Sequence, residues 1–256
     1  MSTTKPVTNK FSSLIGGPWQ MTPGERVAFE SLLQLVEPTL ALEIGTAEGG
    51  SLARIAEHAS ETHSLDLVEP QPWIRDLPGV HIHTGDSHSI LKPLLDSFAA
   101  DGRNIDFVLV DGDHSTEGVC RDLTTLLESD AVRNTLLVLH DTMNPWVRAG
   151  IENADPDSFE KVQTFSLDFI AGGIYGGPSE EPELWGGLGV ALIGETGTGV
   201  SLDTKYRGFH EILQSSIDSG IVQQDEALLK QLDAIQRSKS WRWTAPLRNV
   251  KQIFTD

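Results

Sequence analysis

The sequence predicts an α/β fold in which a mostly parallel sheet carries helices on both of its faces. The first observation is residues 40–51, where a short apolar run passes into a glycine-rich turn and then a helical pattern. The second is a pair of nearly continuous apolar runs, residues 105–110 and 136–139, that each end in ionisable side chains. Parallel strands buried on both faces have this composition. The 256 residues suffice for one such domain with additions, whereas two full domains would be cramped.

The bulk composition is that of a soluble globular protein, with 39% hydrophobic and 22% charged residues. The formal net charge of −18 disfavours a nucleic-acid substrate, since binding a phosphate backbone calls for a basic face. Small molecules or neutral glycans are the expected substrates. No apolar run approaches the length of a membrane span, and the N-terminus lacks the apolar core of a signal peptide. We therefore expect a cytoplasmic protein, and the single cysteine, Cys120, agrees because no intrachain disulfide can form.

The first apolar run and the turn that follows it read ALEIGTAEGGS, in which GTAEGG is the turn. This pattern predicts a binding site for a nucleoside-like ligand. Its helix is expected to begin at Ser51, which is placed to cap it, with Leu52 and Ile55 at helical spacing. Glycines let the backbone approach a ligand closely, and a helix N-terminus offers unpaired N–H groups. The spacing is neither that of GxGxxG dinucleotide loops nor that of phosphate loops. An ordinary tight connection between strand and helix is the alternative.

A helix is predicted ahead of this strand, over residues Pro23–Val36. Thr22 and Glu25 have the spacing of a capping box, with proline at the first helical position. We expect residues 1–21 to form a flexible arm, in which Trp19 either covers a ligand or packs on the fold. The side chains expected to face the sheet are Val27, Leu32, Leu35 and Val36.

Two further acidic residues at predicted strand ends are candidates for holding a nucleoside. Asp66 lies about twenty residues beyond the glycine turn, where a carboxylate can accept two hydrogen bonds from a ribose diol. Glu69 competes for that role, and a solvated strand end is the alternative. Asp86 either accepts a bond from an adenine amino group or caps the helix predicted over residues 90–98.

The densest group of ionisable residues follows the two apolar runs. Asp111, Asp113 and His114 come directly after the first run, and His140 and Asp141 directly after the second. Open α/β sheets place their chemistry at the carboxyl ends of their strands, and neighbouring parallel strands would bring Asp141 beside Asp111. Carboxylates that meet repel each other unless a cation lies between them. The pattern therefore predicts a hard divalent ion, with Mg²⁺ as the default for oxygen ligands.

Together these motifs resemble the class I S-adenosylmethionine (SAM)-dependent methyltransferases, specifically the cephalosporin-hydroxylase-like and macrocin-type sugar O-methyltransferases of methyltransferase domain family 24. The resemblance rests on ALEIGTAEGGS, GDS, VDGDHSxEGVxRDL and LHDT, and it covers approximately residues 22–194. It implies a doubly wound, Rossmann-like, seven-stranded sheet whose last strand, residues 188–194, is antiparallel. It also implies a methyltransferase domain over residues 22–200 and a helical C-terminal extension over residues 201–256. Within these limits the residue pattern predicts a glycine-rich insertion over residues 171–187 and two polar helices over residues 206–219 and 225–238.

The resemblance assigns roles to individual residues. Asp111 and His114 match the catalytic pair, with His114 as the general base. The metal ligands fall on Asp111, His140 and Asp141. His140 departs from the pattern, which has a carboxylate there, so the site either keeps extra waters, prefers Mn²⁺, or holds no metal. The residues that the resemblance places around SAM are Glu43, Gly45, Thr46, Ala47, Gly49, Ser51, Asp66, Asp86, Ser87 and Asp111.

The function predicted from these motifs is SAM-dependent O-methylation of a sugar hydroxyl, assisted by a divalent metal. The tail SWRWTAPLR, residues 240–248, is similar to the ends of enzymes encoded with surface-polysaccharide genes, which favours cell-surface polysaccharide or glycolipid biosynthesis. This tail is expected to contact a membrane surface, a glycosyltransferase or a glycan, or simply to pack, and a homo-oligomer is a further expectation. The alternatives are a metal-independent methyltransferase of small molecules and a non-catalytic partner of a glycan assembly complex.

Overall fold

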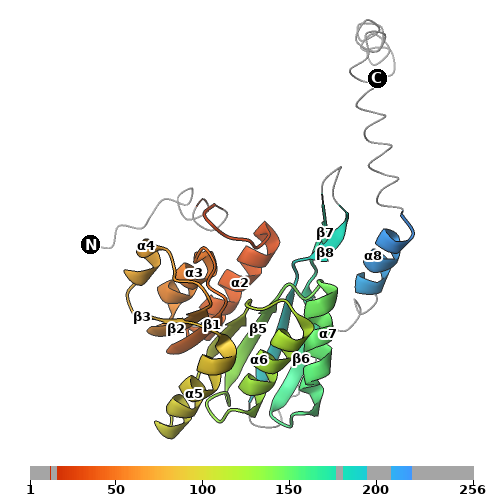
Figure 1. The fold of residues 1–256 in the computed structure, drawn as a ribbon. Helices are drawn as coiled ribbons and strands as arrows, with labels where there is room; N and C mark the ends of the chain where they lie inside the picture. Colours follow the sequence, from red (N-terminus) through yellow and green to blue (C-terminus); the bar gives the residue numbers. More distant parts are fainter. Residues whose placement is uncertain (1–11, 13–15, 177–180, 195–208, 221–256) are drawn as a thin grey trace, which may run out of the picture. The chain divides into compact units, whose positions relative to one another are not determined.

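The computed structural model of the protein describes residue 12 and residues 16–176, 181–194 and 209–220 (Figure 1). It divides into two compact units, one of residues 1–173 with 184–208 and the other of residues 174–183 with 209–256. The predicted helix over residues 225–238 and the tail over residues 240–248 lie outside the described residues. The boundaries proposed at residues 21 and 200 stay predictions.

The first unit contains a seven-stranded sheet in the order β3-β2-β1-β4-β5-β9-β6. The first five strands along the chain pair in parallel, and β9 runs antiparallel to both of its neighbours. This arrangement confirms the fold class predicted from the sequence, including the antiparallel last strand. The strands are β1 (Leu40–Ile44), β2 (Glu61–Asp66), β3 (Val80–Thr84), β4 (Phe107–Val110), β5 (Thr135–His140), β6 (Val162–Ile170) and β9 (Leu188–Ile193).

Helices cover both faces of the sheet and enclose two separate cores (Figure 1). Helices α2 (Pro23–Val36) and α3 (Gly50–His58) cover one face, and α5 (Ser87–Ala100), α6 (Thr116–Glu128) and α7 (Pro145–Ala154) cover the other. Alternate residues of one strand supply the two cores: in β4, Val108 and Val110 pack under α5–α7, whereas Phe107 and Leu109 pack under α2 and α3. This double burial explains the continuous apolar run in the sequence.

Helix α3 begins at Gly50, one residue earlier than predicted, and its cap was misassigned. Gly49, in a left-handed conformation with φ of 82°, is the N-cap residue. Ser51 lies inside the first turn, where its hydroxyl donates to Glu43 over 2.6 Å. The serine therefore stabilises the adjoining strand instead of the helix terminus. Helix α5 also begins earlier than predicted, at Ser87, because Asp86 caps it by accepting from the backbone N–H of His88.

Helix α2 has the predicted limits and the predicted capping box, but its buried face is only partly the predicted one. Leu32 and Val36 pack against the core as predicted, in half-buried positions. Phe29 and Leu33 are fully buried, while Val27 is 47% and Leu35 is 80% exposed. The inward face also carries Glu25, which is completely buried. The apolar pattern alone could not reveal this face, because burying a charged residue depends on partners from distant parts of the chain.

The predicted glycine-rich insertion, residues 171–187, contains two short paired strands, β7 (Gly173–Tyr175) and β8 (Glu183–Trp185). A short helix, α4 (Pro72–Arg75), and a 3₁₀ turn, η1 (Pro156–Ser158), complete the first unit. In the second unit, α8 (Phe209–Asp218) falls within the helix predicted over residues 206–219. None of the described helices combines the length and the apolar character needed to cross a bilayer.

The close packing of β1 against the end of β4 gives a first testable prediction. Gly45 has φ of 94°, and an added Cβ would overlap the backbone carbonyl of Asp111. We expect Gly45→Ala to destabilise the fold by about 3 kcal/mol or more, combining left-handed strain with an overpacked backbone contact. The matched control is Gly102→Ala, because Gly102 has φ of 68° but open space around its Cα. That variant should lose only about 1 kcal/mol in urea unfolding, and similar losses for both would contradict the packing argument.

Candidate active site

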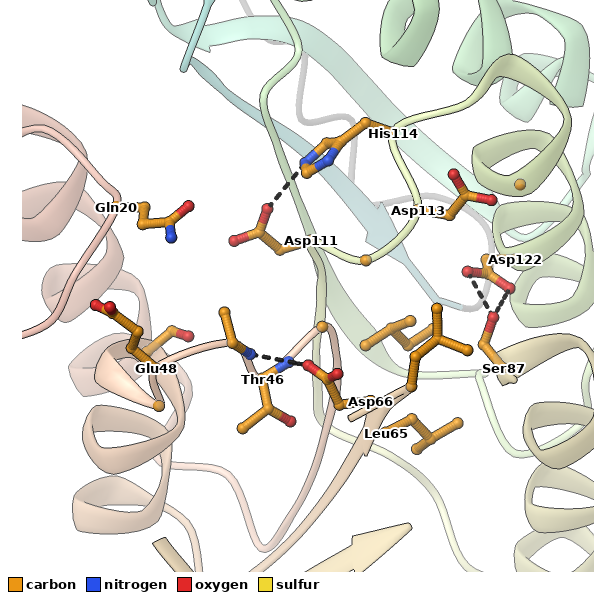
Figure 2. Close-up of a pocket in the computed structure, with 18 of the residues that line it drawn as sticks. Gln20, Thr46, Glu48, Leu65, Asp66, Ser87, Asp111, Asp113, His114 and Asp122 are labelled. Carbon is orange, nitrogen blue, oxygen red and sulfur yellow. Dashed lines mark hydrogen bonds and ion pairs between the residues drawn. The ribbon is translucent and has the colours of Figure 1, made fainter. Parts of the chain in front are cut away.

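A cavity of about 530 Å³ opens where β1, β2 and β4 end (Figure 2). The glycine turn forms its floor, and the segment that precedes α2 forms one wall. A volume of this order suits a small organic ligand. The lining residues are 18–21, 44–51, 65–67, 85–87, 111–114, Gly118, Arg121 and Asp122.

Asp66 holds the glycine turn in place. Its Oδ2 accepts hydrogen bonds from the backbone N–H groups of Thr46 and Ala47, at 2.8 and 2.9 Å (Figure 2). Its Oδ1 accepts from the N–H of Val68 at 2.9 Å. Each carboxylate oxygen has two lone pairs, so only Oδ1 keeps an acceptor position. The predicted ribose contact therefore has room for one hydroxyl, whereas the sequence argument had assumed two.

Glu43 lies beneath the glycine turn and is not among the residues that line the cavity. Its two oxygens accept from the hydroxyls of Ser51, at 2.6 Å, and Ser64, at 2.8 Å. The Ser64 hydroxyl also lies 2.5 Å from that of Thr46. Complete burial raises the pKa of Glu43 to about 8. Its position is that of a support for the turn, one layer below any ligand.

The wall opposite the glycine turn contains a residue that the sequence argument missed. Asp122, on α6, is buried and accepts from the Ser87 hydroxyl at 2.8 Å (Figure 2). Burial raises the pKa of this carboxyl group. The sequence does hold a signal for it, since Asp122 comes three residues after the buried Val119 and thus lies on the inward face of the helix.

Arg26 fastens the segment that forms the remaining wall. Its Nε donates to the carbonyl of Met21 at 2.8 Å, and its Nη2 donates to that of Trp19 at 2.7 Å. The guanidinium also lies 5.3 Å from the centre of the Trp19 ring. Trp19 therefore both packs on the fold and lines the cavity. Arg26 was not anticipated from the sequence, where it reads as an ordinary solvated helix residue.

Two carboxylates and two imidazoles meet at the end of the cavity. His114 Nε2 lies 3.0 Å from Asp141 Oδ2 and 3.7 Å from Asp111 Oδ1. His140 Nδ1 lies 2.9 Å from the same Asp111 oxygen. The structure thus brings together the residues that the strand-end argument expected to meet. Asp113 is the exception, because it turns away and accepts from Ser115.

The potential metal ligands differ from those predicted. Asp111, His114 and Asp141 each offer a ligand atom, and these atoms lie within 4.8 Å of one another. His140 stands behind them with its side chain only 3% exposed, and its Nε2 lies 3.8 Å from Glu25 Oε2. Glu25 in turn accepts from the N–H groups of Thr22 and Gly187. His140 Nδ1 also lies 3.4 Å from Asp141 Oδ2, so His140 orients both carboxylates, and the metal role predicted for it from the sequence stays a prediction.

The cluster distributes charge so that both imidazoles hold protons when no metal is bound. Burial by itself would lower the pKa of His140, but Asp111 and its neighbours raise it well above the usual value. Hydrogen bonding with Asp111 and Asp141 raises the pKa of His114 to about 9. Burial opposes ionisation of Asp141, but both histidines and the Gly186 N–H keep its pKa low. Asp141 stays ionised, and at neutral pH the charged histidines offset the negative charge of the site.

Comparison with known proteins identifies the domain that carries this site. Residues 42–142 match the model of a family described as a methyltransferase domain. The match begins in β1 and ends just after β5, so it includes the glycine turn, Asp66, Asp111, His114 and Asp141. It confirms the methyltransferase identification made from the sequence. Comparison with curated protein sequences found no similar protein.

Solved structures of methyltransferases have a similar fold at low sequence identity. The O-methyltransferase TomG from Streptomyces achromogenes, solved with SAM, is 16% identical over 73% of this chain and 96% of its own, with a TM-score of 0.51. An O-methyltransferase from Bacillus cereus, solved with S-adenosylhomocysteine (SAH), is 15% identical over 73% and 88%, with a TM-score of 0.47. MycE of the mycinamycin pathway, solved with Mg, SAH and mycinamycin VI, is 19% identical over 78% and 57%, with a TM-score of 0.46.

Nine of the ten predicted SAM-binding residues line the cavity. Glu43 is the exception. The contacts of these residues with a cofactor stay predictions. The nine are Gly45, Thr46, Ala47, Gly49, Ser51, Asp66, Asp86, Ser87 and Asp111.

The position of Glu43 predicts how stability depends on pH. Its pKa of about 8 in the folded chain exceeds the usual value of 4.5, so the folded state binds more protons than the unfolded state between these limits. The free energy of unfolding should therefore fall as pH rises from about 5 to 8, by up to about 4 kcal/mol at roughly 1.4 kcal/mol per pKa unit. We expect Glu43→Gln to reduce this fall in urea unfolding, whereas Glu128→Gln, at an exposed position, should not. An unchanged pH profile in Glu43→Gln would show that Glu43 is ionised in the folded protein.

Proposed function

We propose that the protein transfers the methyl group of SAM to a hydroxyl of a sugar, with the help of a divalent cation. The observation that carries the proposal is the meeting of Asp111, His114 and Asp141 at one end of the cavity floored by the glycine turn. A cofactor on that turn would present its methyl group toward residues able to bind and deprotonate a hydroxyl.

The cavity wall offers separate features for each part of SAM. The turn exposes backbone groups at Gly45 and Gly49, and the first N–H groups of α3 follow directly. Asp66 keeps one acceptor position for a ribose hydroxyl, and Asp86 with Ser87 borders the expected adenine position. The fold shared with TomG, which was solved with SAM, supports this placement.

The chemistry requires that a weakly acidic hydroxyl lose its proton as it attacks the methyl group. His114 is the candidate acceptor because its side chain is 40% exposed and its Nε2 lies beside the carboxylate pair. A cation held by Asp111 and Asp141 would lower the pKa that these carboxylates otherwise raise, which would free His114 to accept a proton. The bonds from His140 to Asp111 and from the Gly186 N–H to Asp141 hold that pair in position. A divalent cation between the carboxylates would lower the pKa of a bound hydroxyl. Carboxylate oxygens such as those of Asp111 and Asp141 suit Mn²⁺ as well as Mg²⁺.

The sugar acceptor is supported by the sequence resemblance and by one feature of the site. The Trp185 ring lies 5.4 Å from the His114 ring, nearly perpendicular to it. An indole face beside the catalytic group offers an apolar surface to the C–H groups of a sugar ring. The proposed role in surface polysaccharide or glycolipid assembly, and the contacts of the tail, rest on residues 240–248 alone.

A second candidate function is methyl transfer without a metal. It is favoured by the observation that His114 and His140 already neutralise Asp111 and Asp141. In that case, a carboxylate of the Asp111–Asp141 pair would accept the proton of the substrate hydroxyl, and the charged His114 would stabilise the developing negative charge.

Cofactor binding can be tested by calorimetric titration with SAM and SAH, each with Mn²⁺ or with EDTA. We expect micromolar binding of both. Transfer of a labelled methyl group should then be assayed with methyl glycosides and with catechol as acceptors. Methylated glycoside that forms only with the metal would support the leading proposal, and EDTA-resistant transfer would favour the second. An absence of SAM binding in all conditions would overturn both.

The role of His114 can be separated from that of a metal ligand. His114→Gln should lower kcat by roughly 10²–10⁴ while leaving SAH and Mn²⁺ affinities unchanged, because a general base acts only during turnover. The exposed His88→Gln is the matched control and should retain full activity. If His114→Gln weakens Mn²⁺ binding by tenfold or more, His114 is a ligand and cannot be the base.

Arg26 anchors residues 18–21, which form one wall of the cavity, so its removal should affect cofactor affinity alone. Arg26→Met would leave the carbonyls of Trp19 and Met21 without their donor, so the wall should loosen. We expect SAH to bind about tenfold more weakly, equivalent to about 1.4 kcal/mol. Arg54→Met, which removes an ion pair with Glu30 outside the cavity, should leave SAH binding unchanged. Equal weakening in both variants would indicate a general loss of stability.

A further inference from the structure

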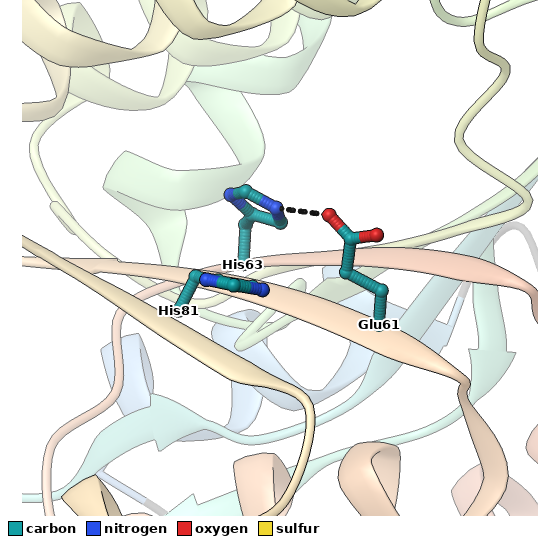
Figure 3. Close-up of side chains that lie close together, drawn as sticks. All are labelled: Glu61, His63 and His81. Carbon is teal, nitrogen blue, oxygen red and sulfur yellow. Dashed lines mark hydrogen bonds and ion pairs between the residues drawn. The ribbon is translucent and has the colours of Figure 1, made fainter.

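A second cluster of potential metal ligands lies on β2 and β3, away from the methyl-transfer cavity (Figure 3). His63 and His81 are direct partners in the parallel register of these strands. Side chains two residues apart on a strand share a face, so Glu61 joins His63, and His83 joins His81. None of these four residues lines the cavity.

The geometry of the cluster centres on His63. Its Nε2 lies 2.8 Å from Glu61 Oε1, and its Nδ1 lies 2.9 Å from His83 Nε2. The His81 ring stacks on the His63 ring, with 4.7 Å between their centres and 27° between their planes. Glu61, His63 and His81 each offer a ligand atom, and these three atoms lie within 4.8 Å of one another. Figure 3 shows the two rings and the carboxylate gathered on one side of the strands.

We propose that Glu61, His63 and His81 bind a divalent transition-metal ion of the Zn²⁺ class. Two imidazoles and one carboxylate form a ligand set that suits Zn²⁺ and disfavours Mg²⁺, which requires oxygen ligands. His81 is exposed, so an ion can enter from solvent and a water molecule can complete its coordination. Ligand atoms around a tetrahedral Zn²⁺ are about 3.3 Å apart. Rotation of the exposed His81 side chain would bring its ring nitrogen from within 4.8 Å of the other two ligand atoms to this spacing.

The hydrogen bonds prepare His63 to ligate an ion. Arg103 and His63 lower the pKa of Glu61 to about 2, so the carboxylate can only accept and His63 Nε2 carries the proton between them. His63 Nδ1 then accepts from His83 Nε2. When an ion takes the place of the Nε2 proton, that proton moves to Nδ1 and His83 shifts to its other tautomer. His63 then donates to His83, which is the outer contact that metal-bound imidazoles usually make.

The surroundings of the cluster are mostly aromatic rings. His63 is only 8% exposed, and the rings of His81, His83 and Phe98 pack against it. One group opposes the binding of a cation: Arg103, whose Nη2 donates to Glu61 Oε2 at 2.7 Å. Its charge weakens the attraction for a cation, but its side chain is 36% exposed and therefore screened by solvent. The same bond fixes the carboxylate and leaves Oε1 facing His63.

A bound ion would link β3, the edge strand of the sheet, to β2. The rest of the edge depends on the β2–β3 backbone ladder and on α5, where Phe98 packs edge-on against His63. Because a ligand that binds only the folded chain raises its stability, occupancy should increase the thermal midpoint of unfolding. The inference does not depend on the proposed function.

The test uses the full-length chain carrying Asp111→Asn and Asp141→Asn, so that the carboxylates of the methyl-transfer site contribute no metal binding. Titration with Co²⁺, a visible-absorbing substitute for Zn²⁺, should reveal one site whose spectrum is abolished by added Zn²⁺ and not by Mg²⁺. Adding His81→Gln should weaken Co²⁺ binding by at least tenfold. Adding His88→Gln, another exposed histidine, should leave it unchanged. Absence of a site in the parent, or equal affinity in the two variants, would overturn the proposal.

Thermal unfolding supplies a second readout. Zn²⁺ should raise the midpoint of the parent and of His88→Gln, but not that of His81→Gln, whose exposed position leaves the fold intact. Glu61→Gln repeats the test on the carboxylate ligand, so the outcome does not rest on one substitution. An equal Zn²⁺-induced shift in all variants would place the ion elsewhere and contradict the assignment.

Discussion

The main chain at Gly45 packs directly against the carbonyl of Asp111, and the geometry of the active site depends on this contact. It joins the ends of β1 and β4, the two central strands that pair in parallel. After Gly45 the chain passes into α3 on one face of the sheet, whereas after Asp111 it passes into α6 on the other. The crevice between such diverging connections is where open α/β sheets bind ligands. Because Gly45 has no side chain, the two strand ends can lie in contact, and this contact positions the Asp111 carboxylate at the edge of the cavity.

Charge compensation is the second constraint. Asp111 and Asp141 follow neighbouring strands, and two ionised carboxylates in a half-buried site need positive charge nearby. The fold supplies it through His114 from the solvent side and His140 from the core. Because His140 also faces Glu25, helix α2 is connected electrostatically to the site as well as packed on the sheet. This connection explains why Glu25 is completely buried in a helix whose sequence pattern suggested an ordinary amphipathic face.

Much of the fold was predictable because its signals are local. The apolar runs defined the central strands, and Thr22 with Glu25 defined the start of α2. The paired acidic strand ends likewise indicated where Asp111 and Asp141 would meet. The failures concern polar groups whose partners are distant in sequence. Glu25 bonds to Gly187, a residue of the last third of the chain, and no periodicity in α2 could reveal that partner. The position of His140 behind the carboxylates has the same origin.

The two histidine clusters show how surroundings decide what an imidazole can do. His114 sits between carboxylates that favour its charged form, so near neutral pH a proton occupies the position that a metal would need. His63 lies among other rings, and burial favours its neutral form. A cation entering the Asp111–Asp141 pair must therefore compete with bound protons, whereas at His63 the protons only move between ring nitrogens. Ligand spacing is similar in both clusters, so it is the balance of charge that decides whether an ion must displace bound protons in order to bind.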